Sequence, residues 1–485
     1  MARRLLRGLV AALPAFLAAC TVGPNFKAPA PPAPTAGYAP VATLRATFGE
    51  GPQLRWWETF GNPRLNALVE RALAGNKSLE ASNATLARAR ERIAAVAGQR
   101  LPQIDANARV EHQQVNLSAF GLDPSSFGGS LGNPEFTLYT VGGGVRYDLD
   151  PFGKNRRSLE QTRAEAEAQL RQTEAAHLTI AGRVVNQVLT IAALDDRIAA
   201  AQELIAENRR NVALTDRKRR GGEGTLVEVL SAESQLTADQ AGLPALEQQR
   251  AEARDMLALL IGVSPAELGP TDFALAAFAL PTPVPVAVPS ALVHKRPDIL
   301  ASEAQLHAAT AAVGVATANL YPDISLGATL TQSSTDLGSL LSSGSRGFDI
   351  FGGLMAPIFH GGTLRAERRG AEAGMRAAAA TYQQTVLEAF TQVSDLLAAL
   401  GNDAATLANQ QQAADVAARS LQLSRRSYEV GNSGVLQVLD ASRAYQRARL
   451  AVLDARSRQY LDIARLYVAT AGGWTGPAAV PAAAP

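Results

Sequence analysis

The sequence predicts a duplicated chain in which long coiled-coil helices alternate with short amphipathic β-hairpins. Residues 296–324 repeat the pattern of residues 76–104 at an offset of 220, and a second match follows at an offset near 209. Residues 152–243 and 358–476 contain no proline, which favours long uninterrupted helices. Four other runs alternate apolar with polar residues, as strands with two different faces do.

The N-terminal residues 1–19 have the pattern of a secretory signal peptide. Three arginines precede an apolar stretch that is too short to span a bilayer. The stretch ends in small residues followed by Cys20, which is similar to the bacterial lipobox, although an ordinary cleavage site beside a chance cysteine is the alternative. On the lipid interpretation, a diacylglycerol thioether and an N-acyl chain on Cys20 anchor the protein to a membrane. Thr21, rather than Asp, after the cysteine indicates the outer membrane.

The composition excludes several classes of protein. The chain has 46 basic and 44 acidic residues, so it is not a polybasic nucleic-acid binder. A single cysteine excludes an internal disulfide and a cysteine-rich metal site. No apolar run of about 18 residues follows residue 20, which argues against a helical integral membrane protein. The five histidines lack metal-site spacing, and Asp195 and Asp196 fit a solvent-exposed helix face, so we expect no metal, no other cofactor and no enzyme.

Each repeat is expected to contain one helical hairpin. We predict these hairpins at about 155–262 and 363–470. Their apolar positions advance in alternating steps of four and three, a period near 3.5 that predicts a left-handed supercoil. Glycine-rich tips at 221–224 and 431–434 interrupt the pattern. The proline-rich segment 281–295 is a stiff linker between a first repeat, 76–280, and a second repeat, 296–475.

The alternating runs predict two strands per repeat. We expect them at about 103–118 and 136–150, then at about 323–332 and 348–358. A soluble sheet with one wet face is one interpretation. If the strands span a membrane they must close into a barrel, and barrels need about eight strands. Four strands cannot close, so copies would have to share a barrel, as a dimer with eight strands or a trimer with twelve.

Five segments carry a resemblance to a known family. They are CTVGPNF at 20–26, WWETFGNPRL at 56–65, YEVG at 428–431, VLDA at 438–441 and GGW at 472–474. In this order, with the duplication and the lipobox, they resemble the TolC-type outer-membrane efflux channels, in the lipoprotein branch typified by OprM and NodT.

The resemblance implies a homotrimer with a 12-stranded β-barrel in outer-membrane lipid that continues into a periplasmic α-helical barrel. Residues 20–75 would form the lipidated N-terminal segment and an equatorial region, with a tail at 476–485. The implied partners are a periplasmic adaptor, or membrane fusion protein, and an inner-membrane pump of the resistance-nodulation-division type. Asn62 stands where the family commonly has Asp, and we expect it to cap a helix.

The resemblance also implies functional residues at the hairpin tips. The periplasmic gate falls on Leu436, Asp440 and Arg443, which share one helical face, with Arg443 spaced to pair with Asp440. Adaptor docking falls on the tips, at Gly222, Gly224, Thr225, Gly431 and Gly434, although turn chemistry alone would also explain the glycines.

Three functions are therefore compatible with the sequence. An exit duct for drugs or other small toxic compounds is favoured. The outer-membrane channel of a type I protein secretion system would share its architecture. A lipid-anchored coiled-coil scaffold is the third.

Overall fold

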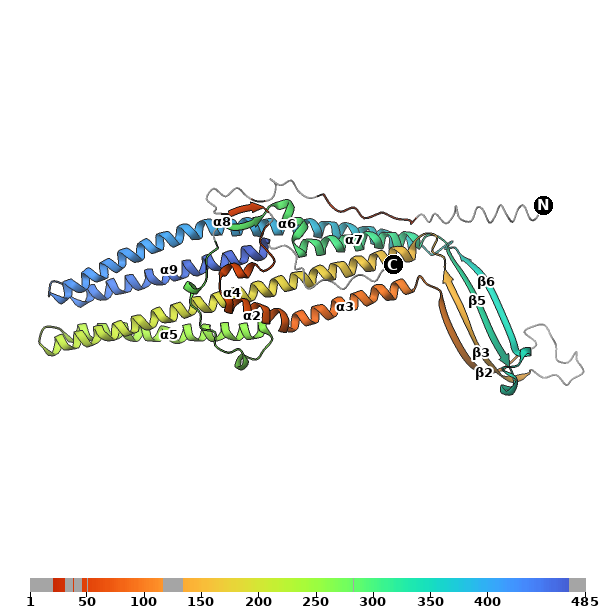
Figure 1. The fold of residues 1–485 in the computed structure, drawn as a ribbon, viewed down its shortest axis with the longest axis horizontal. Coiled ribbons are helices and arrows are strands. Elements are labelled where there is room, and N and C mark those ends of the chain that lie inside the picture. Colours follow the sequence, from red (N-terminus) through yellow and green to blue (C-terminus); the bar gives the residue numbers. More distant parts are fainter. Residues whose placement is uncertain are drawn as a thin grey trace, which may run out of the picture. The chain divides into compact units, whose positions relative to one another are not determined.

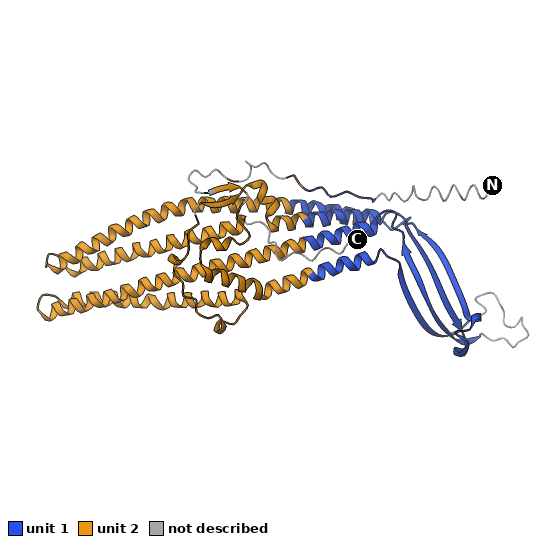
Figure 2. Ribbon diagram, in the orientation of Figure 1, with its two compact units in different colours: residues 1–28, 87–167, 304–380 blue, residues 29–86, 168–303, 381–485 orange. Residues whose placement is uncertain are grey.

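The structure is a computed structural model that describes residues 21–30, 38, 46–49, 51–116, 134–281 and 283–470. The chain forms two compact units, coloured in Figure 2. Unit 1 comprises residues 1–28, 87–167 and 304–380, and unit 2 comprises residues 29–86, 168–303 and 381–485. Each unit takes segments from both repeats, so the linker at 281–295 divides the repeats but not the units.

The helices reproduce the duplication in their lengths. Helices α3 and α7 each have 22 residues, α4 and α8 each have 67, and α5 and α9 each have 36. The predicted pair of long helical hairpins is therefore present, as α4–α5 and α8–α9 (Figure 1). The helices are α2 (Pro63–Gly75), α3 (Lys77–Gly98), α4 (Lys154–Arg220), α5 (Leu226–Ile261), α6 (Pro289–Lys295), α7 (Pro297–Ala318), α8 (Thr363–Glu429) and α9 (Val435–Thr470).

Unit 1 contains a four-stranded antiparallel sheet with the order β2-β3-β5-β6. Its strands are β2 (Gln103–Gln114), β3 (Glu135–Asp148), β5 (Asp323–Ser334) and β6 (Arg346–Met355). The two repeats therefore join through β3 and β5, while β2 and β6 are the edges. The segment β6 ends before the predicted residue 358, because Pro357 has no N–H to continue a ladder. The predicted residues 117 and 118 of the first strand lie outside the described residues.

The register sorts the side chains of this sheet onto two faces. Cross-strand partners lie on the same face of a sheet, so the paired positions can be followed across all four strands. Over residues 104–110, 140–147, 324–331 and 348–354 the apolar face carries Ile104, Ala106, Ala108, Val110, Val141, Gly143, Val145, Tyr147, Ile324, Leu326, Ala328, Leu330, Phe348, Ile350, Gly352 and Leu354, and beyond these ranges it continues with polar residues such as His112, Gln332 and Arg346. The polar face carries Asp105, Asn107, Arg109, Thr140, Gly142, Gly144, Arg146, Ser325, Gly327, Thr329, Thr331, Asp349, Phe351 and Gly353.

The apolar face of the sheet is uncovered. Ile104, Phe348 and Ile350 all have most of their surface exposed, because no other described part of the chain covers them. A face this apolar and this exposed favours contact with lipid or with other copies of the chain. The predicted fold class, long helical hairpins combined with a membrane-type sheet, is confirmed.

The main hydrophobic core lies in unit 2. Trp56, Trp57 and Phe60 are fully buried there beside residues of α4, α5, α8 and α9. The ring of Trp56 stacks on Tyr467 with centroids 5.4 Å apart. Strand β1 (Ala46–Gly49) pairs in parallel with β4 (Val284–Ala287), so the N-terminal segment binds the proline-rich linker. As predicted, Asn62 caps a helix, because its side-chain oxygen accepts hydrogen bonds from two backbone N–H groups at the start of α2.

Helix α4 supplies the centre of this core. One 18-residue window of α4 is long and apolar enough to cross a membrane, but 67% of that window is buried inside the structure. Val184, Val188 and Ile191 follow the predicted alternation of steps of four and three, and all three are completely buried. Packing in the core therefore accounts for the apolar composition of α4. Helix α5 runs through Pro244 without ending, although proline usually breaks a helix.

The expectation of a solvent-exposed face at Asp195 and Asp196 is wrong. Asp195 accepts a hydrogen bond from the backbone N–H of Phe273 at 3.1 Å, and Asp196 accepts one from Leu275 at 3.3 Å. Arg250 also pairs with Asp195 at 2.6 Å. Burial raises the pKa of both carboxyls above the ordinary value. The two residues hold the connector that follows α5 against α4, a contact that the local pattern could not reveal.

Candidate functional site

The two hairpin tips are turns of the same design. Residues 221–225 join α4 to α5, and residues 430–434 join α8 to α9. Gly222 and Gly431, which are equivalent in the two repeats, have φ angles of 81° and 80°, a conformation that favours glycine. These two glycines are therefore required by the turns themselves.

The other predicted tip residues differ in role. Thr225 caps α5 in a capping box with Glu228, in which each side chain bonds the other residue's backbone N–H. A side-chain carbon at Gly224 would lie 3.2 Å from the backbone nitrogen of Arg219, so this position is crowded. At Gly434 an added carbon would meet no atom within 4 Å. Gly434 is thus the tip position with the fewest constraints inside the chain.

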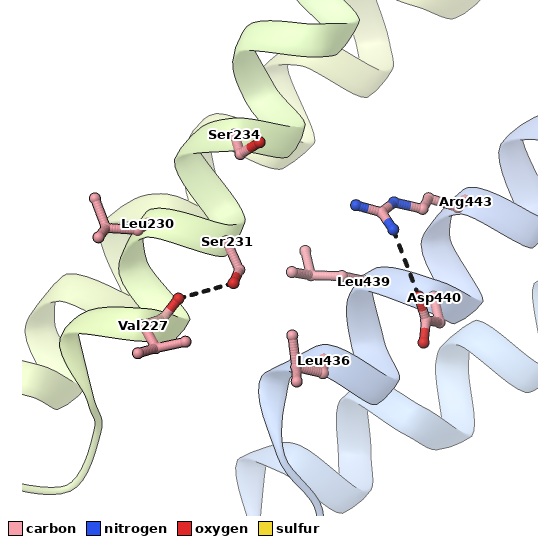
Figure 3. A pocket seen from close by; sticks show the side chains of 8 residues that line it. All are labelled: Val227, Leu230, Ser231, Ser234, Leu436, Leu439, Asp440 and Arg443. Atoms are coloured by element: carbon pink, nitrogen blue, oxygen red, sulfur yellow. Dashed lines mark hydrogen bonds and ion pairs between the residues drawn. The ribbon is translucent and has the colours of Figure 1, made fainter.

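The predicted gate residues lie together at the start of α9. Leu436, Asp440 and Arg443 line a groove of about 380 Å³ between α5 and α9. Figure 3 shows these side chains across from those of α5. The groove has one apolar end and one charged end, and its other lining residues are Val227, Leu230, Ser231, Ser234 and Leu439.

Arg443 makes two contacts that differ in kind. Its Nη1 lies 3.7 Å from Oδ1 of Asp440, so the two form an ion pair at the predicted spacing, although this distance is too long for the charge-assisted hydrogen bond that the spacing favoured. Both side chains are largely exposed, so this ion pair contributes at most about 1 kcal/mol. Its Nε also donates a hydrogen bond to Oε1 of Gln235, a buried residue on α5. The second contact joins the two hairpins, and it could not be predicted from local spacing because Gln235 belongs to the other repeat.

Further charged contacts tie the first hairpin to the second. Lys218 Nζ donates to the carbonyl oxygen of Tyr428 at 3.0 Å and lies 3.8 Å from the centre of the Tyr428 ring. Further from the tips along the two hairpins, Arg449 pairs with Glu203 at 2.5 Å. Two further pairs between the hairpins are Arg425 with Glu207 and Arg197 with Asp454. Any movement that separates the two tips must break contacts of this set.

The two tips bury their apolar residues to different extents. Leu226 and Leu230 of the first tip are 60% and 54% exposed, whereas the equivalent Val435 and Leu439 of the second tip are 2% and 3% exposed. In the second hairpin these residues form an apolar cluster with Tyr428. The position equivalent to Tyr428 in the first hairpin is Arg219, which cannot fill that cluster. The first tip therefore presents an apolar surface to the outside of the chain.

In unit 1, the segment that follows Cys20 is fixed to helices α4 and α7. We call residues 21–28 the strap. The buried guanidinium of Arg157 donates to the carbonyl oxygens of Val22 and Gly23 and to Asn25 Oδ1, the last at 2.7 Å. Cys20 itself lies outside the described residues.

His307 completes the attachment of the strap. The ring of Phe26 stacks on His307 with centroids 4.3 Å apart, and His307 Nε2 lies 3.0 Å from Glu160. Burial acts to raise the pKa of Glu160, but hydrogen bonds from Arg157 and His307 outweigh it and hold that pKa below its ordinary value. Glu160 therefore stays ionised and orients both partners. The motif at 20–26 gave no indication of these helix contacts.

Metal binding finds no support in the part of the chain that the structure describes. Within residues 21–30, 38, 46–49, 51–116, 134–281 and 283–470, no three His, Cys, Asp or Glu side chains are grouped so that they could hold a metal ion. The functional groups of the two tips are apolar residues, ion pairs and turn glycines.

Comparisons with known proteins place this geometry in context. A family model described as outer membrane efflux protein matches residues 68–263 and 288–472, which is most of the chain. The pyoverdine export outer membrane protein OpmQ of Pseudomonas putida is 29% identical over 92% of this chain and 94% of its own length.

Two further matches cover nearly the whole chain. The probable outer membrane lipoprotein SilC of Salmonella typhimurium is 27% identical over 95% of this chain and 97% of its own. The solved structure of the outer-membrane channel OprN has a TM-score of 0.84 and 29% identity, and the match covers 94% of this chain and all of that one.

Proposed function

The chain belongs to the outer membrane efflux protein family, and we propose that three copies of it form a passive, gated exit duct for small toxic compounds. As a member of this family it is an outer-membrane channel that works with a periplasmic adaptor and an inner-membrane pump. We propose the number of copies in the assembly, the residues that close the duct, the lipid that anchors the protein and the surface on which the adaptor docks.

The unpaired edges of the sheet support assembly from several copies. Strands β2 and β6 are the edges of the four-stranded sheet, and each has a row of backbone groups with no strand partner among the residues that the structure describes. In lipid such groups must be paired, so β6 of one copy is expected to pair with β2 of the next. Three copies close twelve strands, with the apolar face toward lipid and the polar face toward water. This amphipathic sheet with two open edges is the observation that carries the proposal.

The gate is proposed to be formed by Leu436, Asp440 and Arg443 of each copy. Around a threefold axis, three Leu436 side chains would form an apolar constriction and three Asp440 carboxylates an acidic ring that attracts cations. Arg443 links this ring to Gln235 on the first hairpin. Opening then requires the tip of the second hairpin to leave the first, which breaks the contacts of Arg443 and Lys218 described above.

Lipid attachment at Cys20 is proposed from the lipobox and from the strap. A diacylglycerol and an N-acyl chain on Cys20 would hold the first residues at the membrane, and SilC, a relative, is named a probable lipoprotein. The strap that follows Cys20 is fixed by Arg157 and His307. A short fixed strap keeps the acylated residue close to the part of unit 1 to which it binds.

The adaptor is proposed to dock on the hairpin tips. The first tip exposes Leu226 and Leu230, whose equivalents are buried in the second tip. Exposed apolar groups beside a turn are suited to contact with another protein. The tip residues Gly222, Gly224, Thr225, Gly431 and Gly434 then set the shape of the surface that the adaptor meets.

The duct itself is proposed to carry out no catalysis and to hold no metal or other cofactor. Energy for transport would come from the inner-membrane pump, and the choice of cargo from that pump as well. The part supplied by this chain is a path that water and solutes can cross when the gate is open.

The experiment is single-channel recording in planar lipid bilayers. The double variant Asp440→Ala with Arg443→Ala removes both the acidic ring and the tie to Gln235, and we expect a larger conductance than that of the parent protein. The variant Arg447→Ala is the matched control, because Arg447 lies one helical turn further along and bonds only to a carbonyl of its own helix. Equal conductance of the parent and the double variant would contradict the gate assignment.

A further inference from the structure

The polar face of the sheet carries one aromatic ring deep within it. Phe351 of β6 lies on this face between Asp349 and Gly353, and its direct cross-strand partner is Gly327 of β5. Apart from Phe136 at the outer start of β3, it is the one aromatic residue of this face in the four described strands. An aromatic residue among glycines, threonines and charges requires a physical reason.

The ring of Phe351 lies against the backbone of Gly327. A side-chain carbon at Gly327 would meet Cζ of that ring first and would come within 2.7 Å of Cε1, closer than real Cβ atoms approach, while Cε2 would lie 3.1 Å away. Phe351 is accordingly 41% exposed, compared with 77% for Phe348 and for Ile350 of the same strand. The ring is therefore folded down on the sheet, over a glycine that leaves room for it.

The first repeat has no such ring at the equivalent place. By the offsets of the duplication, Gly142 corresponds to Phe351 and Asn107 corresponds to Gly327. Asn107 and Gly142 are themselves direct cross-strand partners, as Gly327 and Phe351 are. Each repeat thus pairs one glycine with one larger residue, but only in the second repeat is that larger residue a phenylalanine.

We propose that the pair Gly327 and Phe351 sets the bore of the open barrel. The inference rests on the proposed function, in which the polar face lines the water-filled lumen. With glycine at 327 the ring lies flat on the wall, and the lumen stays wide. A side chain at 327 would occupy the place of the ring and turn it into the lumen, once in each copy of the assembly.

The test uses a channel whose gate is already open, because a closed gate would hide changes in the barrel. In the background Asp440→Ala with Arg443→Ala, three variants are compared: Gly327→Val, Phe351→Ala and the two together. Single-channel conductance is measured in planar bilayers, together with the largest neutral polyethylene glycol that enters the pore. We expect Gly327→Val to lower conductance about twofold, since conduction follows the radius of the narrowest part.

Rescue distinguishes a displaced ring from added bulk. Adding Phe351→Ala to Gly327→Val should restore the conductance and the polymer limit, because no ring remains to be displaced. Phe351→Ala alone should raise both quantities, and it tests the proposal even if the valine variant does not fold. The matched control is Gly353→Val, which adds the same side chain to the same face opposite Ser325, where no ring lies.

The outcomes separate this proposal from the proposed function. Equal losses in Gly327→Val and Gly353→Val, or no rescue by Phe351→Ala, would overturn the role of the ring while leaving the channel intact. Unchanged conductance and polymer limit in Phe351→Ala would overturn it as well. Absence of ion current in the open-gate parent would instead contradict the proposed function.

Discussion

Loss of the Lys218 contact should shift the gate toward its open state. Lys218 joins the first hairpin to Tyr428 of the second, by a hydrogen bond of 3.0 Å and by a cation–π contact of 3.8 Å. The variant Lys218→Met keeps the length of the side chain and removes both interactions. The residue belongs to a basic run at 217–220 whose other members stay on their own helix.

The size of the effect follows from the two contacts. A partly exposed hydrogen bond from a charged donor contributes about 1 kcal/mol, and a cation–π contact near the surface adds about 0.5 to 1 kcal/mol. Three copies that open together would lose about 5 kcal/mol, and each 1.4 kcal/mol changes an equilibrium about tenfold. The ratio of open to closed channels should therefore rise by roughly 10³- to 10⁴-fold.

The assay is the open probability of single channels in planar bilayers. The matched control is Arg217→Met, because Arg217 carries the same charge one residue away and bonds only to a carbonyl of α4. We expect the control to behave as the parent does. Equal open probabilities for Lys218→Met and Arg217→Met would refute the role of this contact between the hairpins.

Two further predictions concern stability and the strap. Burial and the neighbouring Asp462 raise the pKa of Asp403 to about 6. Protonation of Asp403 in the folded protein therefore contributes stability that is fully present below about pH 4 and is lost as the pH rises through 6. Asp403→Asn should therefore raise Tm, followed by circular dichroism, more at pH 7.5 than at pH 4, and an equal change at both would contradict this. Arg157→Ala should release the strap and speed its cleavage by protease, compared with the exposed control Arg163→Ala; equal rates would contradict the contacts of Arg157.

The repeated elements could be predicted from the sequence because their causes are local. Proline-free stretches with a period near 3.5 predicted the two hairpins, and alternation of residues predicted the four strands that carry Ile104 and Val141 on one face. The i, i+3 spacing of Asp440 and Arg443 likewise predicted their pairing. Each of these features depends on neighbours within a few residues.

The contacts between distant segments could not be predicted in this way. Gln235 meets Arg443, and Asp195 meets Phe273, only after the two hairpins and the connector have packed together. The pairing of β1 with the proline-rich linker also needs a partner far along the chain. The exposure of Leu226 could not be predicted either, because the equivalent Val435 in the second tip is buried. The predicted lipid site at Cys20 lies outside the described residues and stays a prediction.

A sheet of four strands per chain can close into a barrel only when several copies share it. Native mass spectrometry of the protein extracted from the outer membrane in detergent counts the copies directly. We expect a complex of three chains, which carries ion current after it is returned to a lipid bilayer. A single chain in detergent, silent in the bilayer, would contradict it.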